Sequence, residues 1–192
     1  MTAHASTLAE YQRKTAANRL GLWLFILSDA FVFGGLYVSR FYLLGTGSRP
    51  EVNQLVGLAV TSILLLSSFF MNRAESAMAH GDQKTFLNGT LITLILGSLF
   101  LIGVVGVEWQ IAPFGPGDGV AASLFYAMTG FHAFHVLSGV IFLAVVYSNG
   151  RRGRYSAERH WAVEACAVYW HFVDVVWIFF YPALYLIGSA AI

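Results

Sequence analysis

The chain has 192 residues, of which 57% are hydrophobic and only 11% charged. A soluble domain carries roughly 25% charged residues, so this chain lacks the polar side chains that would cover a globular surface in water. Its formal net charge of +1 excludes both the charge excess of a disordered protein and the basic surplus of a nucleic-acid-binding protein. The single cysteine, Cys166, excludes a disulfide framework and a cysteine-based metal site within the chain. The composition therefore indicates an integral membrane protein.

Apolar runs of about 20 residues, the length that crosses the hydrocarbon core of a bilayer, occur repeatedly. They cover residues 20–44, 52–71, 86–107, 120–147 and 161–187. These runs are continuous rather than alternating, which favours helices over the strands of a transmembrane barrel. The sequence therefore predicts an all-α fold, a polytopic bundle of five transmembrane helices in a single membrane domain over residues 1–192.

Basic residues are distributed unevenly over the segments that connect these spans. Three precede the first span, two lie between the second and third, and four lie between the fourth and fifth. The other two, Arg40 and Arg49, fall on the opposite side of the membrane. Because segments rich in Lys and Arg stay in the cytoplasm, we predict a cytoplasmic N-terminus and an external C-terminus. The connections are short, so none holds a soluble catalytic domain.

Ionisable side chains at membrane depth are costly to insert and are by default candidates for function. They are Asp29 in the first span, His132 and His135 in the fourth, and Glu164, His171 and Asp174 in the fifth. On a helix that turns 100° per residue, the three in the fifth span point within about 80° of one another. The two histidines of the fourth span lie one turn apart. We expect these two polar stripes to meet across a helix interface.

The histidines leave two interpretations open. Paired histidines on helices can hold haem iron, and three histidines with a carboxylate can hold zinc or non-haem iron, so a membrane haem-binding redox protein is one hypothesis. In the other, they form hydrogen bonds with acids or backbone carbonyls of neighbouring helices and pin the bundle. Asp29 is likewise a station of a proton relay, a partner of a lipid head group, or a buried acid paired with a neighbouring helix.

Two motifs in the last two spans resemble the signature of a known family. The stretch YWHFVDVVW occupies residues 169–177 after Glu164, and TGFHAFHV occupies residues 129–136. Both resemble subunit III of the haem-copper terminal oxidases, which include cytochrome c and quinol oxidases. Shorter matches at HGD (80–82) and EWQIAPF (108–114) extend the resemblance over nearly the whole chain from residue 20. The chain is most similar to the short five-helix bacterial form, since the first two helices of the seven-helix form have no counterpart in it.

The resemblance implies a non-catalytic subunit of an oxidase in aerobic respiration. In the family, haem and copper belong to subunits I and II, while subunit III flanks subunit I, holds phospholipids in a cleft, supports proton uptake and protects the active site during turnover. We therefore expect no cofactor in this chain and no catalysis by this chain alone. The expected partners are subunits I and II and membrane lipids, and the expected location is the inner (cell) membrane of a bacterium.

The resemblance also implies roles for particular residues. It makes Arg159 and His160, which precede the last span, lipid-binding candidates. Trp170 is added as a third candidate from its depth in the last span alone, where it faces another helix, a lipid or a partner subunit. Asp29, which follows Ser28, occupies a position where the seven-helix form usually has a glutamate that reacts with a hydrophobic carbodiimide. Aspartate keeps the acid but shortens its reach. Because short relatives of subunit III also occur with nitric oxide reductases, an accessory subunit of such an enzyme is a further hypothesis.

Overall fold

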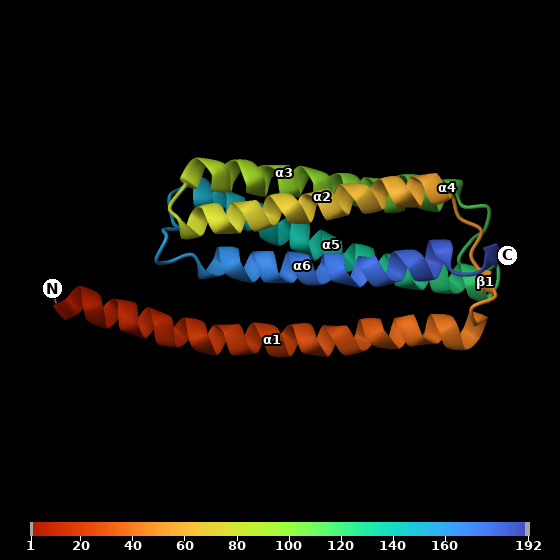
Figure 1. The fold of residues 1–192 in the computed structure, drawn as a ribbon, viewed down its shortest axis with the longest axis horizontal. Helices are drawn as coiled ribbons and strands as arrows, with labels where there is room; N and C mark the ends of the chain where they lie inside the picture. The colour runs from red at the N-terminus through yellow and green to blue at the C-terminus, as the bar shows by residue number, and fades with distance from the viewer. Residues whose placement is uncertain (1, 191–192) are drawn as a thin grey trace.

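The computed structural model describes residues 2–190, and five long helices dominate it (Figure 1). These helices are α1 (Thr2–Leu44), α2 (Gln54–Ala79), α3 (Gln83–Leu101), α5 (Val120–Arg151) and α6 (Trp161–Tyr181). The π-helices η1 (Ile102–Glu108) and η2 (Pro182–Leu186) continue α3 and α6, and the short α4 (Trp109–Ile111) follows η1. With these extensions, five helices are long and apolar enough to cross a membrane. The predicted all-α bundle of five membrane-spanning helices is therefore confirmed.

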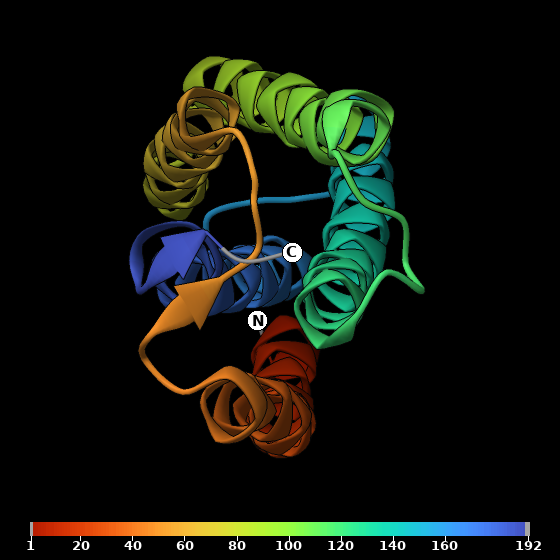
Figure 2. The ribbon, with the colours of Figure 1, turned by 90° about the vertical axis from the view of Figure 1, so that its right-hand side faces the viewer.

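The helices run side by side along one axis, and α6 lies in the middle of the bundle (Figures 1 and 2). In the end view of Figure 2, α2 and α3 lie above α6, α5 lies to its right, and α1 lies below it. The burial of the spans follows this arrangement, because 61% of the span built on α6 is buried and only 11% of the span built on α1. The first helix therefore exposes most of its surface.

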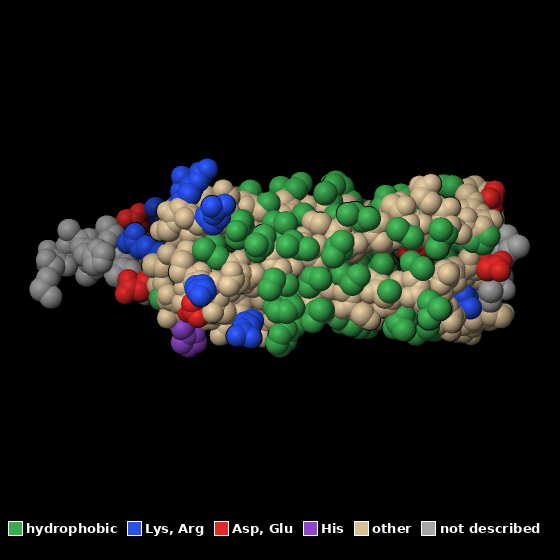
Figure 3. Space-filling model, turned by 90° about the horizontal axis from the view of Figure 1, so that it is seen from above, with side chains coloured by type: hydrophobic (Ala, Val, Ile, Leu, Met, Phe, Trp, Pro, Cys, Tyr) green, Lys and Arg blue, Asp and Glu red, His purple; other side chains and the backbone are tan. Residues whose placement is uncertain are grey.

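The two ends of the bundle differ in charge. Blue Lys and Arg side chains gather at the end where the N-terminus lies, which we call the basic end, and hydrophobic side chains cover the middle (Figure 3). The opposite end, which we call the C-terminal end, carries η1, η2 and a two-residue parallel ladder of β1 (Ser48–Arg49) and β2 (Ser189–Ala190). An apolar belt between two polar ends is the surface expected of a protein in contact with lipid.

Side-chain caps define the hairpin of α2 and α3. Asn53 accepts hydrogen bonds from the backbone N–H groups of Leu55 and Val56 and so starts α2. Asp82 accepts from the N–H of Thr85 and starts α3, and these hydrogen bonds hold the pKa of the Asp82 carboxyl below its ordinary value. Between the helices, Gly81 adopts a φ of +78°, a conformation that favours glycine. Local sequence thus makes these two helices antiparallel neighbours.

Trp170 occupies the centre of the helix packing and is 1% exposed. Its ring fills the space left by Gly97 of α3 and Gly139 of α5, because a Cβ on Gly97 would lie 2.8 Å from the ring Cζ2 and one on Gly139 would lie 2.9 Å from Cε3. The indole Nε1–H donates to the Ser67 hydroxyl of α2 at 3.0 Å. One side chain of α6 therefore contacts three other helices, and it offers no surface to a lipid.

A second indole repeats this link one heptad further along α6. Trp177 is fully buried, and its Nε1–H donates to the Thr61 hydroxyl of α2 at 2.9 Å. The hydroxyl of Thr61 in turn donates to its own helix, at the carbonyl of Gly57. Both tryptophans thus satisfy their only donor inside the bundle, where no water is available to do so.

We predict that Gly97→Ala destabilises the bundle by about 1–3 kcal/mol, because the added methyl group meets a tryptophan ring that is held on every side. Unfolding of the purified protein in mixed micelles, followed by helical circular dichroism, measures the change. Gly34→Ala is the matched control, because nothing lies within 4 Å of a Cβ at this position of α1. Equal stability of the two variants would contradict the central role of Trp170.

Candidate functional site

Asp29 and His135 form a pair between α1 and α5, midway along both spans. The Asp29 Oδ2 atom lies 3.5 Å from His135 Nε2, with side-chain exposures of 19% and 9%. The other ring nitrogen, Nδ1, lies 2.8 Å from the carbonyl oxygen of Phe131. A carbonyl only accepts, so Nδ1 carries a proton and donates it. Any hydrogen bond between Nε2 and Asp29 then needs one further proton, held either by the acid or by the ring.

Neighbouring groups fix the orientation of the His135 ring. Phe33 of α1 approaches it edge-on, with 4.8 Å between ring centroids, and Phe131 lies 4.7 Å away. The Tyr169 hydroxyl of α6 donates to the His135 carbonyl at 3.2 Å and lies 2.6 Å from the Ser138 hydroxyl. Groups from three helices therefore hold the His135 ring so that it faces Asp29. This arrangement suits a site that keeps one proton at membrane depth.

His132, one turn from His135, lies in the core without a hydrogen-bond partner. It is 0% exposed, and neither ring nitrogen is bonded to any group of the described chain. Its ring packs on Trp177 at 4.8 Å and against Phe100 at 5.7 Å between centroids. The two histidines of α5 thus have different surroundings, and only His135 faces an acid.

Glu164 joins the start of α6 to α1 at the basic end. Its Oε2 lies 2.6 Å from the Arg19 guanidinium, and its Oε1 lies 3.3 Å from His160 Nε2. The Arg19 guanidinium also lies over the Trp161 ring, 5.8 Å from its centroid. The backbone N–H of Trp161 donates to the Tyr11 hydroxyl at 3.1 Å. Of the lipid-binding candidates, His160 lies inside this cluster.

The remaining candidates on α6 face α2. His171 Nδ1 lies 3.3 Å from the Ser68 hydroxyl, and Asp174 is 7% exposed with its Oδ1 unpartnered. No hydrogen bond or ion pair within residues 2–190 joins the histidines of α5 to the acids of α6. The expected meeting of the two polar stripes is therefore wrong. The reason is the rotation of the two helices, since His171 of α6 lies against Ser68 of α2, whereas His135 of α5 lies against Asp29 of α1.

The sequence did not predict the burial of two ionisable residues near the C-terminal end. Glu108 is 1% exposed and accepts a hydrogen bond of 2.6 Å from the hydroxyl of Tyr185, which is itself fully buried. The predicted span ended one residue before Glu108, whereas η1 carries it inside the bundle. The EWQIAPF stretch, already noted for its resemblance, was the signal that could have identified it.

Arg40 is the second. It is 0% exposed, and the sequence analysis used it only to orient the chain. Its guanidinium donates to the carbonyls of Ala183 at 2.8 Å, Gly45 at 2.8 Å, Ser48 at 2.7 Å and Ile187 at 3.0 Å. The end of α1, the following turn and η2 thus share one cation. The sequence does not indicate such a site, because every acceptor of the Arg40 guanidinium is a backbone carbonyl rather than an acidic side chain.

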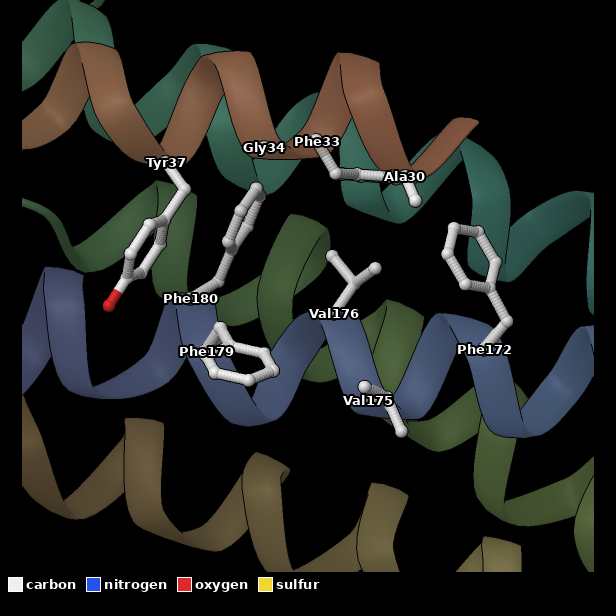
Figure 4. Close-up of a pocket in the computed structure, with 9 residues that line it drawn as sticks. All are labelled: Ala30, Phe33, Gly34, Tyr37, Phe172, Val175, Val176, Phe179 and Phe180. Atoms are coloured by element: carbon white, nitrogen blue, oxygen red, sulfur yellow. The ribbon is translucent and has the colours of Figure 1, made fainter. Parts of the chain in front are cut away.

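Three hollows follow one another along the seam between α1 and α6. A polar hollow at the basic end includes Arg19 and His160. An apolar hollow beside Trp23 comes next, and a third of about 300 Å³ lies between Phe33 and Phe180. Figure 4 shows the aromatic side chains of α1 and α6 that line this third hollow. The seam is therefore polar at one end and apolar along the rest of its length.

No group of three His, Cys, Asp or Glu side chains in the described part of the chain is placed to hold a metal ion. His132, His135 and His171 lie in three different surroundings, so they do not form the ligand set that the metal hypothesis required. The arrangement instead joins helices through polar pairs and leaves one acid–imidazole pair partly accessible from the membrane.

Comparison with known proteins tests the resemblance. A family profile described as cytochrome c oxidase subunit III matches residues 4–189. The chain belongs to the cytochrome c oxidase subunit III family. The resemblance inferred from the two motifs is thus confirmed.

The relatives include both long and short members of the subunit III family. Cytochrome c oxidase subunit 3 of Gadus morhua is 36% identical over 184 residues, which cover 89% of this chain and 70% of that protein. The Equus caballus protein is 37% identical with the same coverage. The Thermostichus vulcanus protein is 36% identical over 174 residues, 88% of this chain and 86% of its own length.

We predict that Tyr185→Phe lowers the free energy of unfolding by about 1–3 kcal/mol, because it leaves the buried Glu108 carboxyl without its donor. Thermal unfolding in detergent measures the loss. Tyr181→Phe is the matched control, because the Tyr181 ring stacks on Tyr185 but its hydroxyl makes no hydrogen bond within residues 2–190. A loss of the same size in both variants would assign the effect to packing rather than to Glu108.

Proposed function

We propose that this protein is the non-catalytic subunit III of a haem-copper terminal oxidase in aerobic respiration, and that it flanks subunit I and assembles with subunit II. The observation that carries the proposal is the family match over residues 4–189. The geometry supports it, since Asp29 pairs with His135 and Glu164 with Arg19, so that these polar residues join helices of the bundle. Haem and copper then belong to the partner subunits, and the chain itself needs neither.

We predict that the protein copurifies with a haem-copper catalytic subunit after mild detergent extraction, and that the isolated chain has no haem absorbance. Mass spectrometry of the purified complex identifies the partners, and an optical spectrum of the isolated chain tests for haem. A catalytic subunit of nitric oxide reductase in the complex would support the alternative assembly. Stoichiometric haem in the isolated chain would overturn the proposal.

The proposed orientation places the N-terminus in the cytoplasm and the C-terminus outside, in the inner membrane of a bacterium. Two features support it. Most basic residues lie at the basic end, in agreement with retention of positive loops in the cytoplasm. At the other end, Arg40 and Arg49 both donate to backbone carbonyls, so their charges serve the fold rather than the surface.

The Asp29–His135 pair is the proposed link to proton uptake and active-site protection. A carboxyl and an imidazole that share one further proton can move it between Asp29 and His135, so the pair is either neutral or an ion pair and carries no net charge in lipid. The partial exposure of Asp29 gives a neighbouring subunit access to the pair. The pair therefore supports a role in buffering protons beside the catalytic subunit.

We predict that Asp29→Asn leaves assembly intact but makes the oxidase lose activity faster during turnover, by about two- to tenfold in rate, because the amide occupies the same space but cannot exchange a proton as a carboxyl does. Oxygen consumption recorded over many turnovers measures the half-life of activity. Asp29→Glu, which restores the residue usual in longer relatives, is the matched control and keeps the half-life near that of the native protein. Identical inactivation kinetics in all three proteins would leave Asp29 as a packing residue.

The seam between α1 and α6 is the proposed lipid site. Its polar hollow lies at the basic end, where Arg19, Arg159 and His160 are available to a phosphate, and its apolar hollows accept an acyl chain. Trp170 is left out of this site, because it is buried between Gly97 and Gly139. Phospholipid in the seam would cover the exposed inner face of α1 and hold this helix to the bundle.

A further inference from the structure

His171 lies on an outer face of the bundle, where α2 and α6 meet. Its ring Nδ1 lies 3.3 Å from the Ser68 hydroxyl of α2. Leu65, one turn before Ser68, is 43% exposed, and Ile178, two turns after His171, is 46% exposed. Residues three or seven apart share one side of a helix. These four residues therefore form one surface, which we call the α2–α6 face.

The α2–α6 face is left open by the other helices of residues 2–190. In the end view of Figure 2, α2 and α6 border the left side of the bundle, α1 lies below α6, and α5 lies to the right of α6. The Asp29–His135 pair joins α1 to α5 and so belongs to another side of the molecule. The α2–α6 face is therefore available to a molecule that does not contact this pair.

The second ring nitrogen of His171, Nε2, reaches this surface. Within residues 2–190 the ring forms its hydrogen bond through Nδ1 and none through Nε2. The enclosed polar atoms without a partner include both nitrogens of His132 and Oδ1 of Asp174, but not His171 Nε2. The hollow beside Trp23, which the ring also lines, is apolar, so the carbon edge of the ring faces it. Nε2 is therefore open to a neighbouring molecule.

The depth of His171 makes an unpaired nitrogen costly. The residue follows Trp161, the first residue of α6, by about 15 Å at 1.5 Å of rise per residue. That distance is half of a hydrocarbon core about 30 Å thick, where no water is available to form a hydrogen bond. Ionisable side chains at this depth normally face a partner. We therefore expect Nε2 to be paired in the assembled complex.

An acyl chain cannot satisfy Nε2, because it carries neither a donor nor an acceptor. A transmembrane helix can, because hydroxyl and amide side chains form hydrogen bonds between helices at membrane depth. Such a side chain both donates and accepts, so it suits either tautomer of His171. Beside the imidazole, Leu65 and Ile178 offer apolar contact to the rest of that helix.

We propose that the α2–α6 face binds a transmembrane helix of another oxidase subunit, and that this helix presents a hydroxyl or amide side chain to His171 Nε2. The inference rests on the proposed function as an oxidase subunit and assigns to that function a contact surface. It also gives His171 a role in assembly, which its contact with Ser68 alone does not require.

Photo-crosslinking in the oxidase complex tests the contact. A benzophenone amino acid replaces Ile178 in one variant and Leu65 in another, and the membranes are irradiated before extraction. Mass spectrometry of the adducts is expected to find the same subunit in both, at a transmembrane segment with Ser, Thr, Asn or Gln near its middle. Adducts with lipid alone, with a second copy of this chain, or with a segment that lacks such a residue would overturn the inference. Absence of any haem-copper subunit from the purified complex would instead overturn the proposed function.

Matched variants test the hydrogen bond itself. His171→Phe keeps a ring but removes Nε2, and we expect the ratio of complex-bound to free chain in native mass spectrometry to fall about fivefold. This change corresponds to about 1 kcal/mol and to one hydrogen bond between transmembrane helices. Ser68→Ala removes the internal partner of the ring and leaves Nε2 in place, so the complex is retained. Equal losses in the two variants would assign the effect to packing within this chain and overturn the hydrogen bond, as would full retention in His171→Phe.

Discussion

The hydrogen-bond donors that the aromatic side chains of α6 and η2 carry into the bilayer find their partners inside the protein, and this constraint organises the structure. The central helix shows it most clearly. Trp170 and Trp177 of α6 donate to Ser67 and Thr61 of α2, and Tyr185 donates to Glu108 of η1. In water each of these donors could be satisfied by solvent, whereas in hydrocarbon an unpaired group costs several kcal/mol. The hydrogen bonds therefore fix which face of α6 meets α2, and the glycines of α3 and α5 let the large rings fit behind that face.

The first helix follows a different rule, because it is attached at a few points rather than along its length. At the basic end Arg19 and Tyr11 engage the start of α6, and at the C-terminal end Arg40 binds the carbonyls of η2. Between these points the Asp29–His135 pair is the polar contact, and hollows remain along the seam. The inner face of a helix held in this way is open between these contacts. The phospholipid of the proposed function would cover this face.

Sequence reasoning predicted the five spans and the family, and it missed most of the partners. The spans follow from composition alone, since long apolar runs have one stable form in a bilayer. Which acid meets which histidine depends on the rotation of each helix within the bundle, and the spacing of Asp29, His132 and His135 could not distinguish the ring that faces the acid from the ring that lies among aromatic side chains. Trp170 was predicted to bind lipid, whereas it is buried. Two glycines on other helices create its site, and their distance in the sequence hid this packing. Arg40 was missed because its acceptors are carbonyls.

The packing of α1 also has a consequence for the order in which the membrane protein is made. Of the five described spans, α1 leaves the ribosome before the others, yet its polar contacts are with α5 and α6, which follow α2 and α3 in the chain. Until α5 and α6 are made, α1 lacks these contacts, although it is long and apolar enough to cross a membrane despite Asp29. When the later helices pack against α1, His135 becomes the partner of Asp29, and the folded protein keeps this pair.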